Sequence, residues 1–219
     1  MISNQCCPAA TALPTIPAVT CAKRFGQIQK IIFQRIYSSG STRNSITGVT
    51  TGTATVGDAT LLASWTALKA VADGTKIAVT PFIEEPADDG GDARTVGGGN
   101  ASLNGIETVI GSNPVNFSCK LNNVPQDVVA EIKKLMCECL GGNLGVYLVN
   151  ENGQIQGQVI ATGSTTKTWA PIPIQKLFVG DLKHGNLEGN DYNDLQFAFA
   201  PGYSDKLDIL TLDQSALSL

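Results

Sequence analysis

The spacing of apolar residues changes character several times along this chain, and each change predicts a different element. Residues 26–37 (GQIQKIIFQRIY) carry isoleucine on both sides of an extended segment. One side holds Ile28, Ile32 and Ile36, and the other holds Ile31, Phe33 and Tyr37. Because side chains alternate across a strand, this pattern predicts a strand that is covered on both faces.

A second strand and an amphipathic helix follow in the middle of the chain. Residues 114–121 (PVNFSCKL) alternate apolar and polar positions, and the next segment repeats apolar residues every three or four positions. Pro125 suits the first turn of a helix, Asp127 complements its positive end, and Gly141-Gly142 stops it. The apolar face would consist of Val128, Val129, Ile132, Leu135, Met136, Cys139 and Leu140. A lone helix of about 15 residues is unstable in water, so this face should pack on a sheet.

Further strands and a second, shorter helix complete the predicted fold. Asn152-Gly153, flanked by LGVYLV and QIQGQVI, is the strongest turn signal in the chain and predicts a hairpin. Residues 60–72 (TLLASWTALKAVA) predict the short helix, which Asp73-Gly74 ends. The other expected strands are TKIAVTPFI (75–83), PIPIQKLFVG (171–180), LQFAFA (195–200) and DKLDILTL (205–212). The expected fold is therefore mainly β, a sandwich or barrel, with one packed amphipathic helix and a second short helix.

Residues 38–59 (SSGSTRNSITGVTTGTATVGDA) predict a long inserted β-hairpin. Their apolar residues are too sparse to form a core, while threonine, a strand former, outnumbers the residues typical of a linker. Because a lone hairpin is only marginally stable in water, either a neighbouring subunit completes its sheet or the segment is a linker loop. We interpret it as an assembly hairpin. Its candidate contact residues are Arg43, Ile46, Val49, Thr51, Thr53 and Val56.

Residues 84–103 (EEPADDGGDARTVGGGNASL) predict a polar, glycine-rich loop. The three aspartates lack the 1-3-5 spacing and the terminal glutamate of a calcium-binding EF-hand loop. The glycines do not follow a strand and open a helix in the register of a nucleotide-binding loop. We therefore expect neither calcium nor a nucleotide here.

The chain is expected to begin with an extended arm, residues 1–22, followed by a single β-rich domain over residues 23–219. Three prolines interrupt the arm, which lacks the basic start and unbroken apolar core of a signal peptide. No run approaches the roughly 18 apolar residues that cross a bilayer, so no membrane insertion is expected. Without an export signal, the six cysteines should be reduced, buried thiols. A metal ion or a disulfide formed after lysis are the alternatives.

The composition favours a surface that other copies cover. Apolar residues make up 42% of the chain, but charged residues only 16%, against the roughly 25% of a typical soluble domain. A free monomer normally depends on charge for solubility, whereas a self-assembling subunit depends on it less. The formal net charge is −4, which argues against tight binding to nucleic acid through phosphate neutralisation. An ordinary extracellular β protein remains the alternative.

Candidate chemistry is sparse. The single histidine, His184, lies near Asp181, Glu188, Asp191 and Asp194, which is a conceivable metal site but is more typical of a hydrated turn. No serine or cysteine is placed for a nucleophilic triad, and no catalytic, cofactor-binding or metal-binding residue is predicted. An enzyme would need a metal within residues 181–194 or a thiolate at Cys137 or Cys139.

The order of elements resembles the tail tube proteins of long-tailed bacteriophages and of contractile injection machines. The resemblance rests on the segment 38–59 and on the strand, helix and hairpin unit NPVNFSCKLNNVPQDVVAEIKKLMCECLGGNLGVYLVNENGQIQG. It is a similarity of layout over about two thirds of the chain. It implies a virion structural protein, built in the cytoplasm of a host bacterium, in which six copies close a ring by pairing sheet edges.

The same resemblance implies that such rings stack into a tube, with the early hairpin reaching the adjacent ring. DNA would pass through the tube and contact it only non-specifically, and other virion proteins would be partners. The cysteine-bearing arm departs from this pattern, which leaves a head-tail connector or neck ring, a tail terminator and a capsid-associated protein as alternatives. A capsid-decorating or carbohydrate-binding β sandwich is a further alternative of a different class.

Overall fold

The computed structural model describes residues 18, 24–101, 105–185 and 189–219. Residues 25–92 and 112–219 form one compact unit, and residues 93–111 belong to a second. The expected fold class is confirmed, because the chain is mainly β with a curled antiparallel sheet and two α-helices. The expected arm, residues 1–22, lies outside the described residues apart from Ala18.

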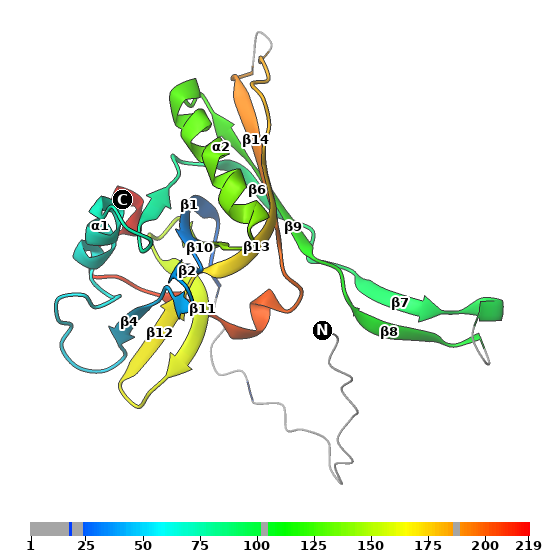
Figure 1. Cartoon of the computed structure of the whole chain (residues 1–219), viewed down its shortest axis with the longest axis horizontal. Helices are drawn as coiled ribbons and strands as arrows, with labels where there is room; N and C mark the ends of the chain where they lie inside the picture. The colour runs from blue at the N-terminus through cyan, green and yellow to red at the C-terminus, as the bar shows by residue number, and fades with distance from the viewer. Residues whose placement is uncertain (1–17, 19–23, 102–104, 186–188) are drawn as a thin grey trace. The chain divides into compact units, whose positions relative to one another are not determined.

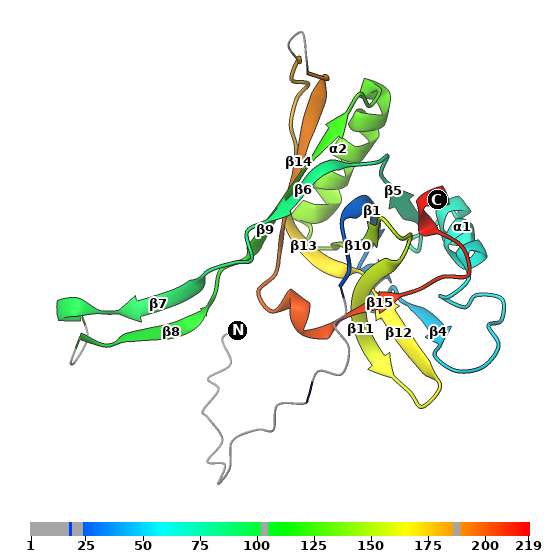
Figure 2. The ribbon, with the colours of Figure 1, turned by 180° about the vertical axis from the view of Figure 1, so that it is seen from behind.

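The main unit is one antiparallel sheet of 11 of the described strands (Figures 1 and 2). Along its main path the strands run in the order β4-β12-β11-β10-β13-β14-β9-β6, while β1 and β5 extend it from β10 and β15 pairs with β11. The early strands are β1 (Ile28–Arg35), β4 (Ile46–Val49), β5 (Ile77–Val79), β6 (Glu84–Asp88) and β9 (Val115–Asn122). The later strands are β10 (Leu144–Asn150), β11 (Ile155–Thr162), β12 (Thr166–Ala170), β13 (Ile172–Val179), β14 (Tyr192–Phe199) and β15 (Leu207–Leu210).

Strand β10 lies at the centre of this sheet, and all seven of its residues are buried. It pairs with β1 over its whole length, with β13 near Gly145 and with β11 near Val149. The close approach of β13 requires glycine at position 145, since a Cβ there would lie 2.8 Å from Pro171 Cβ and 2.9 Å from the Ile172 carbonyl oxygen. The curl of the sheet therefore begins at β10.

Strand β1 is covered on both faces, as its sequence predicts. Ile31 and Phe33 enter one buried cluster, and Ile32 enters the other. Ile28, expected on the face of Ile32, packs instead against the cluster that contains Ile31. The reason is a β-bulge between Ile28 and Lys30, because one extra residue in a strand moves the following side chains to the opposite face.

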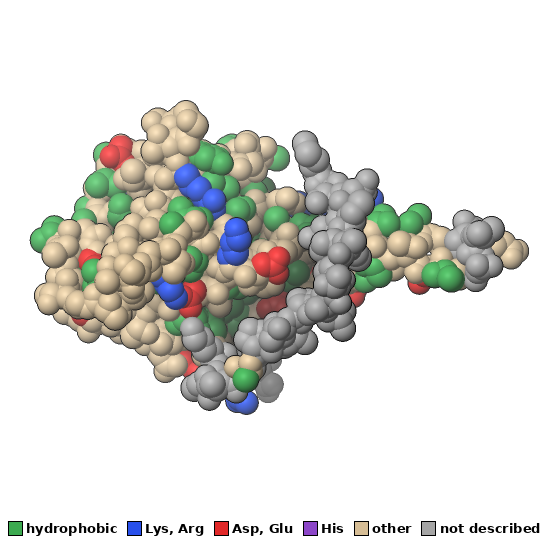
Figure 3. All heavy atoms as spheres, turned by 90° about the horizontal axis from the view of Figure 1, so that it is seen from below, with side chains coloured by type: hydrophobic (Ala, Val, Ile, Leu, Met, Phe, Trp, Pro, Cys, Tyr) green, Lys and Arg blue, Asp and Glu red, His purple; other side chains and the backbone are tan. Residues whose placement is uncertain are grey.

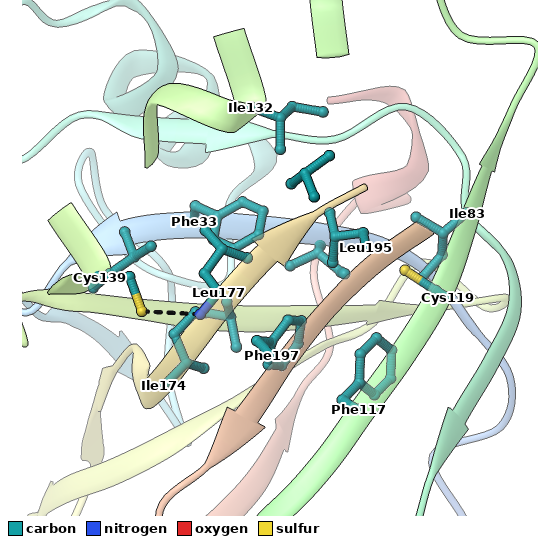
Figure 4. Close-up of a cluster of buried hydrophobic side chains, with 14 of the residues drawn as sticks. Phe33, Ile83, Phe117, Cys119, Ile132, Cys139, Ile174, Leu177, Leu195 and Phe197 are labelled. Atoms are coloured by element: carbon teal, nitrogen blue, oxygen red, sulfur yellow. Dashed lines mark hydrogen bonds between the residues drawn. The ribbon is translucent and has the colours of Figure 1, made fainter. Parts of the chain in front are cut away.

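The larger cluster lies beneath helix α2 (Gln126–Leu140), which packs on β13 (Figure 1). Val129, Ile132 and Cys139 of the helix are buried, whereas Leu140, expected on the apolar face, is 89% exposed. Leu140 is the last helical residue, directly after Cys139, which is the last helical residue buried against the sheet. Figure 4 shows the phenylalanines of this cluster, where Phe117 and Phe197 stack with ring centroids 4.8 Å apart.

The smaller cluster lies beside helix α1 (Leu62–Ala70). Trp65 is fully buried, meets the ring of Tyr147 edge-to-face at 5.0 Å, and donates its indole N–H to the Ala59 carbonyl oxygen at 2.9 Å. Short 3₁₀ turns also occur at Gly99–Ala101, Tyr203–Lys206 and Ala216–Ser218. Ala216 is fully buried in this cluster, so the last 3₁₀ turn packs on the main unit of the same chain.

The prediction of one long hairpin over residues 38–59 is wrong. A small hairpin joins β2 (Tyr37–Ser39) to β3 (Thr42–Arg43), and β4 then enters the main sheet by pairing with β12. Ile46 is buried by this pairing, and the loop over residues 50–57 is mostly exposed. The pairing joins segments about 120 residues apart, so the local pattern of residues could not indicate it.

The prediction of a loop over residues 84–103 is also wrong. Strand β6 pairs with β9 at one end of the sheet, and a second, two-stranded sheet joins β7 (Ala93–Gly97) to β8 (Glu107–Ser112). A long inserted hairpin therefore exists, but it lies at residues 93–112. Residues 84–103 hold five glycines and three aspartates, residue types typical of turns, which is why the sequence predicts a loop.

The aromatic cluster should dominate stability. Replacing Phe197 with alanine should lower the free energy of unfolding by about 3–5 kcal/mol, because the cavity left among Phe33, Phe117 and Phe199 cannot close. Gln196→Ala, on the adjacent exposed position, should change it by less than about 0.5 kcal/mol. Urea unfolding followed by fluorescence measures both, and equal effects would contradict the assignment of this core.

Candidate functional site

The hairpin β7–β8 exposes almost everything it carries. All five residues of β7 are exposed, and so is every residue of β8 except Ile110, which is half-buried. Val96 and Val109 are 56% and 63% exposed. A side-chain hydrogen bond of 3.0 Å from Thr95 Oγ1 to Glu107 Oε1 joins the two strands. A two-stranded hairpin that buries no apolar face is only marginally stable in water on its own.

The ends of this hairpin lie side by side on the main unit. The Asn113 N–H donates to the Asp92 carbonyl oxygen at 2.8 Å, and the Asp89 N–H donates to the Asn116 carbonyl oxygen at 3.2 Å. The Asp89 carboxylate accepts hydrogen bonds from the side chain and the backbone N–H of Asn116, which lower its pKa. The strands β6 and β9 are thereby hydrogen-bonded to each other before the hairpin begins. Residues 93–111 are therefore an insertion that the main unit does not need in order to pair these two strands.

The two ends of the main strand path are protected against pairing with other strands. Strand β6 contains Pro86, which has no N–H to donate, beside Glu84 and the left-handed Glu85 (φ 49°). Strand β4 is closed within the chain, because its Thr47 carbonyl oxygen accepts the Ala59 N–H at 2.9 Å. Its Val49 N–H donates to Asp58 Oδ2 at 3.0 Å. Neither edge offers a full row of free backbone groups.

Asp58 fixes the outer edge of β4. It is 6% exposed, and Oδ1 accepts the backbone N–H and the hydroxyl of Thr60 at 2.8 and 2.7 Å, while Oδ2 accepts the Val49 N–H. Burial alone would raise the pKa of this carboxyl group, but the hydrogen bonds from Thr60 and Val49 outweigh burial and lower it. The ionised form therefore holds the chain against β4.

The predicted contact residues of segment 38–59 are divided between the core and the surface. Arg43 is half-buried and donates to Gln158 Oε1 at 2.8 Å, Ile46 is buried, and Val49 is half-buried beside Thr166. Thr51 and Thr53 are exposed, and Val56 is fully exposed. As contacts with another chain these residues stay a prediction, but Arg43 and Ile46 already make contacts within their own chain. The exposed valines of the β7–β8 hairpin were missed because an uncovered strand shows no hydrophobic periodicity.

An apolar groove of about 430 Å³ lies between β4 and α1. Ile46 and Thr47 form its strand side, and Ala63, Ala67 and Leu68 form its helix side. Val56, on the loop that leads into α1, also lines the groove. None of the residues that line it is charged.

Three lysines, on β9, on α2 and before β14, are paired with carboxylates. Lys120 lies 2.5 Å from Glu85, Lys183 lies 2.5 Å from Asp194, and Lys133 lies 2.6 Å from Asp181. The hydrogen bond from Lys133 lowers the pKa of Asp181, and the hydrogen bond to Asp194 raises the pKa of Lys183. Figure 3 shows that charged side chains are few and scattered on the face it presents. Such paired cations offer little attraction to phosphate.

The described cysteines and the histidine do not form a common metal site. Cys119 and Cys139 are buried and Cys137 is exposed, and all three are free thiols. The Leu177 N–H donates to Cys139 Sγ at 3.3 Å (Figure 4). His184 Nδ1 lies 3.4 Å from Asp191, on the exposed surface. No group of three or more potential metal ligands occurs among the described residues, and Cys6, Cys7, Cys21 and Glu188 lie outside them.

No described helix is long and apolar enough to cross a membrane. No protein family model matches the chain, and no curated protein or solved structure matches it either.

Replacing Asp58 with alanine should lower the free energy of unfolding at neutral pH by about 1–3 kcal/mol, because three donors lose their acceptor. Its pKa is lower in the folded chain, so its contribution is present above the unfolded pKa and is lost as the pH falls through the folded pKa. The difference between wild type and Asp58→Ala should therefore shrink in acid. Urea unfolding across the acidic range measures this difference, and a constant value would contradict the assigned role.

Thiol labelling should separate the three described cysteines. Burial raises the pKa of Cys119 to about 12, so this thiol should resist a disulfide reagent at pH 8 for as long as the chain stays folded. Cys137 should label at once, and all three should label in denaturant. Peptide mapping by mass spectrometry reads each site, and rapid labelling of Cys119 in the native chain would show that β9 is not packed as described.

Proposed function

We propose that this chain is a structural subunit that assembles with copies of itself, and that the β7–β8 hairpin is its principal contact element. The observation that carries the proposal is the exposure of both strands of this hairpin, with Val96 and Val109 each more than half exposed. An element of this kind gains stability only when another surface covers it. In this proposal residues 93–112 take the principal role that the sequence analysis gives to residues 38–59.

A second copy of the chain is the simplest partner. The hairpin offers backbone groups on both outer edges, and strand addition is a general way for one chain to complete the sheet of another. At the ends of the main path, β6 contains a proline and β4 has backbone groups that are already hydrogen-bonded within the chain. Strand pairing with another copy is therefore expected at the hairpin and at short strands such as β5 and β15. A closed cyclic arrangement of copies would convert these exposed edges into a ring.

The finer proposal is a ring-forming subunit of a phage tail tube, in which six copies close each ring, rings stack and DNA passes through the centre. Its support is the layout of the sequence, the low fraction of charged residues and the pairing of Lys120, Lys133 and Lys183 with carboxylates. Lysines that are paired with carboxylates would bind a passing polyanion more weakly than free lysines would. The subunit would belong to a virion and have no catalytic role. A neck ring or a capsid-decorating module is the alternative.

Excision of the hairpin tests the proposal. Residues 93–112 should be replaceable by Asn-Gly, because the Asp92 carbonyl oxygen and the Asn113 N–H are already hydrogen-bonded and can flank a two-residue turn. The excised variant should unfold with nearly the stability of wild type but remain a monomer at concentrations where wild type forms larger particles. Mass photometry and negative-stain electron microscopy measure the particles.

The matched control shortens the exposed loop of residues 51–55 to Gly-Gly in the full chain. This variant should assemble as wild type does. If the loop variant fails to assemble while the excised variant still assembles, segment 38–59 and not the β7–β8 hairpin is the principal contact element. A monodisperse wild-type monomer at every concentration would contradict self-assembly altogether.

A further inference from the structure

The groove between β4 and α1 exposes apolar surface that the main unit does not cover. Helix α1 turns Trp65 into the core, but Ala63 and Ala67 are exposed and Leu68 and Val71 are only half-buried along the groove. Val56 lines the groove from the loop that leads into the helix and is fully exposed. The helix therefore carries a second apolar side, which a single subunit leaves open to water.

The occupant of such a groove should be free of charge, because burying an unpaired charge against apolar side chains is costly. The amino-terminal 22 residues fit this requirement, since all 34 charged residues of the chain follow them, 15 basic and 19 acidic. Within these residues the sequence LPTIPAV places Leu13, Ile16 and Val19 at every third position. An extended proline-containing chain has three residues per turn, so every third side chain meets the same surface.

The length of the segment allows it to reach another copy. The main unit begins at Phe25, whose carbonyl oxygen accepts a hydrogen bond from the Asn150 side chain. Val19 and Leu13 precede Phe25 by 6 and 12 residues, so they can lie up to roughly 20 and 40 Å from it at about 3.3 Å per residue, which is enough to reach an adjoining copy. The β7–β8 hairpin is a poorer fit for the groove, because it carries Arg94 and Glu107.

We propose that residues 13–19 of a second copy occupy the groove between β4 and α1, with Leu13, Ile16 and Val19 against the apolar side chains. This inference rests on the proposed self-assembly and names a second surface for it. The contact passes from one copy to the next, so each subunit both gives a segment and receives one. It adds an attachment that does not depend on strand pairing, and it gives the uncharged start of the chain a function.

Photo-crosslinking of the full chain tests this proposal. Val56 is replaced by p-benzoylphenylalanine, which the fully exposed position tolerates, and chains with and without ¹⁵N label are mixed before assembly. After irradiation, mass spectrometry identifies the crosslinked peptides and the label of each partner. The expected result is a crosslink from position 56 to a peptide containing residues 13–19 that carries the opposite label.

Each other outcome would overturn the proposal. A crosslink to residues 13–19 of the same chain would mean that the segment folds back, and a crosslink to residues 93–112 would assign the groove to the hairpin. Assembled particles without any crosslink to residues 13–19 would leave the groove without this occupant. Particle mass, measured on the same samples, separates these failures from the failure of self-assembly, in which no particles form.

A pair of variants on helix α1 provides the matched control. Ala67→Arg places a charged side chain in the groove, whereas Ala70→Arg places the same side chain at an exposed position of the same helix that does not line the groove. Both alanines are exposed and arginine is a good helix former, so both variants should fold. Ala67→Arg should reduce the yield of the crosslink between copies at least tenfold and Ala70→Arg should not change it. Equal yields would contradict the proposal.

Discussion

The packing of β10 against three other strands is the constraint on which the rest of the structure depends. A strand in a flat sheet has one neighbour on each side, but β10 shares one side between β13 and β11. This division requires Gly145, where β13 crosses close to the backbone, and it directs the later strands into two branches. One branch lies beneath α2 and the other beside α1, so both apolar clusters are organised by the same strand.

The burial of apolar side chains distinguishes the scaffold from the proposed contact surfaces. In the main unit, most large apolar side chains are buried in two clusters, and the strands at the two ends of the main path have few backbone groups free for pairing. In the β7–β8 hairpin and in the groove beside α1, apolar side chains stay exposed although the chain has enough length to cover them. Exposed apolar surface on an element with little stability of its own is costly for a monomer and useful for a subunit. The low charge of the chain agrees with this division, because a surface covered by other copies needs little charge.

The sequence predicted the elements whose side chains are buried and missed those defined by distant pairing or by exposure. The alternation in β9, the period of α2 and the Asn152-Gly153 turn each reflect one buried face, so local spacing was sufficient. The bulge near Ile28 depends on its partner strand, and β4 depends on β12, so neither could be recognised locally. The hairpin of residues 93–112 gave no periodic signal, because neither of its faces is covered within the chain. Of the predicted contact residues, the exposed ones, Thr51, Thr53 and Val56, are all in the loop after β4.

Amide hydrogen exchange of the β7–β8 hairpin, measured with particle mass over a concentration series, tests the central claim most directly. If copies of the chain cover this hairpin, its amides should exchange rapidly in the dilute monomer and become protected at the concentrations where the mass rises. The amides of β10 should be protected throughout. Protection of the hairpin in the monomer, or rapid exchange of the hairpin within assembled particles, would contradict the account.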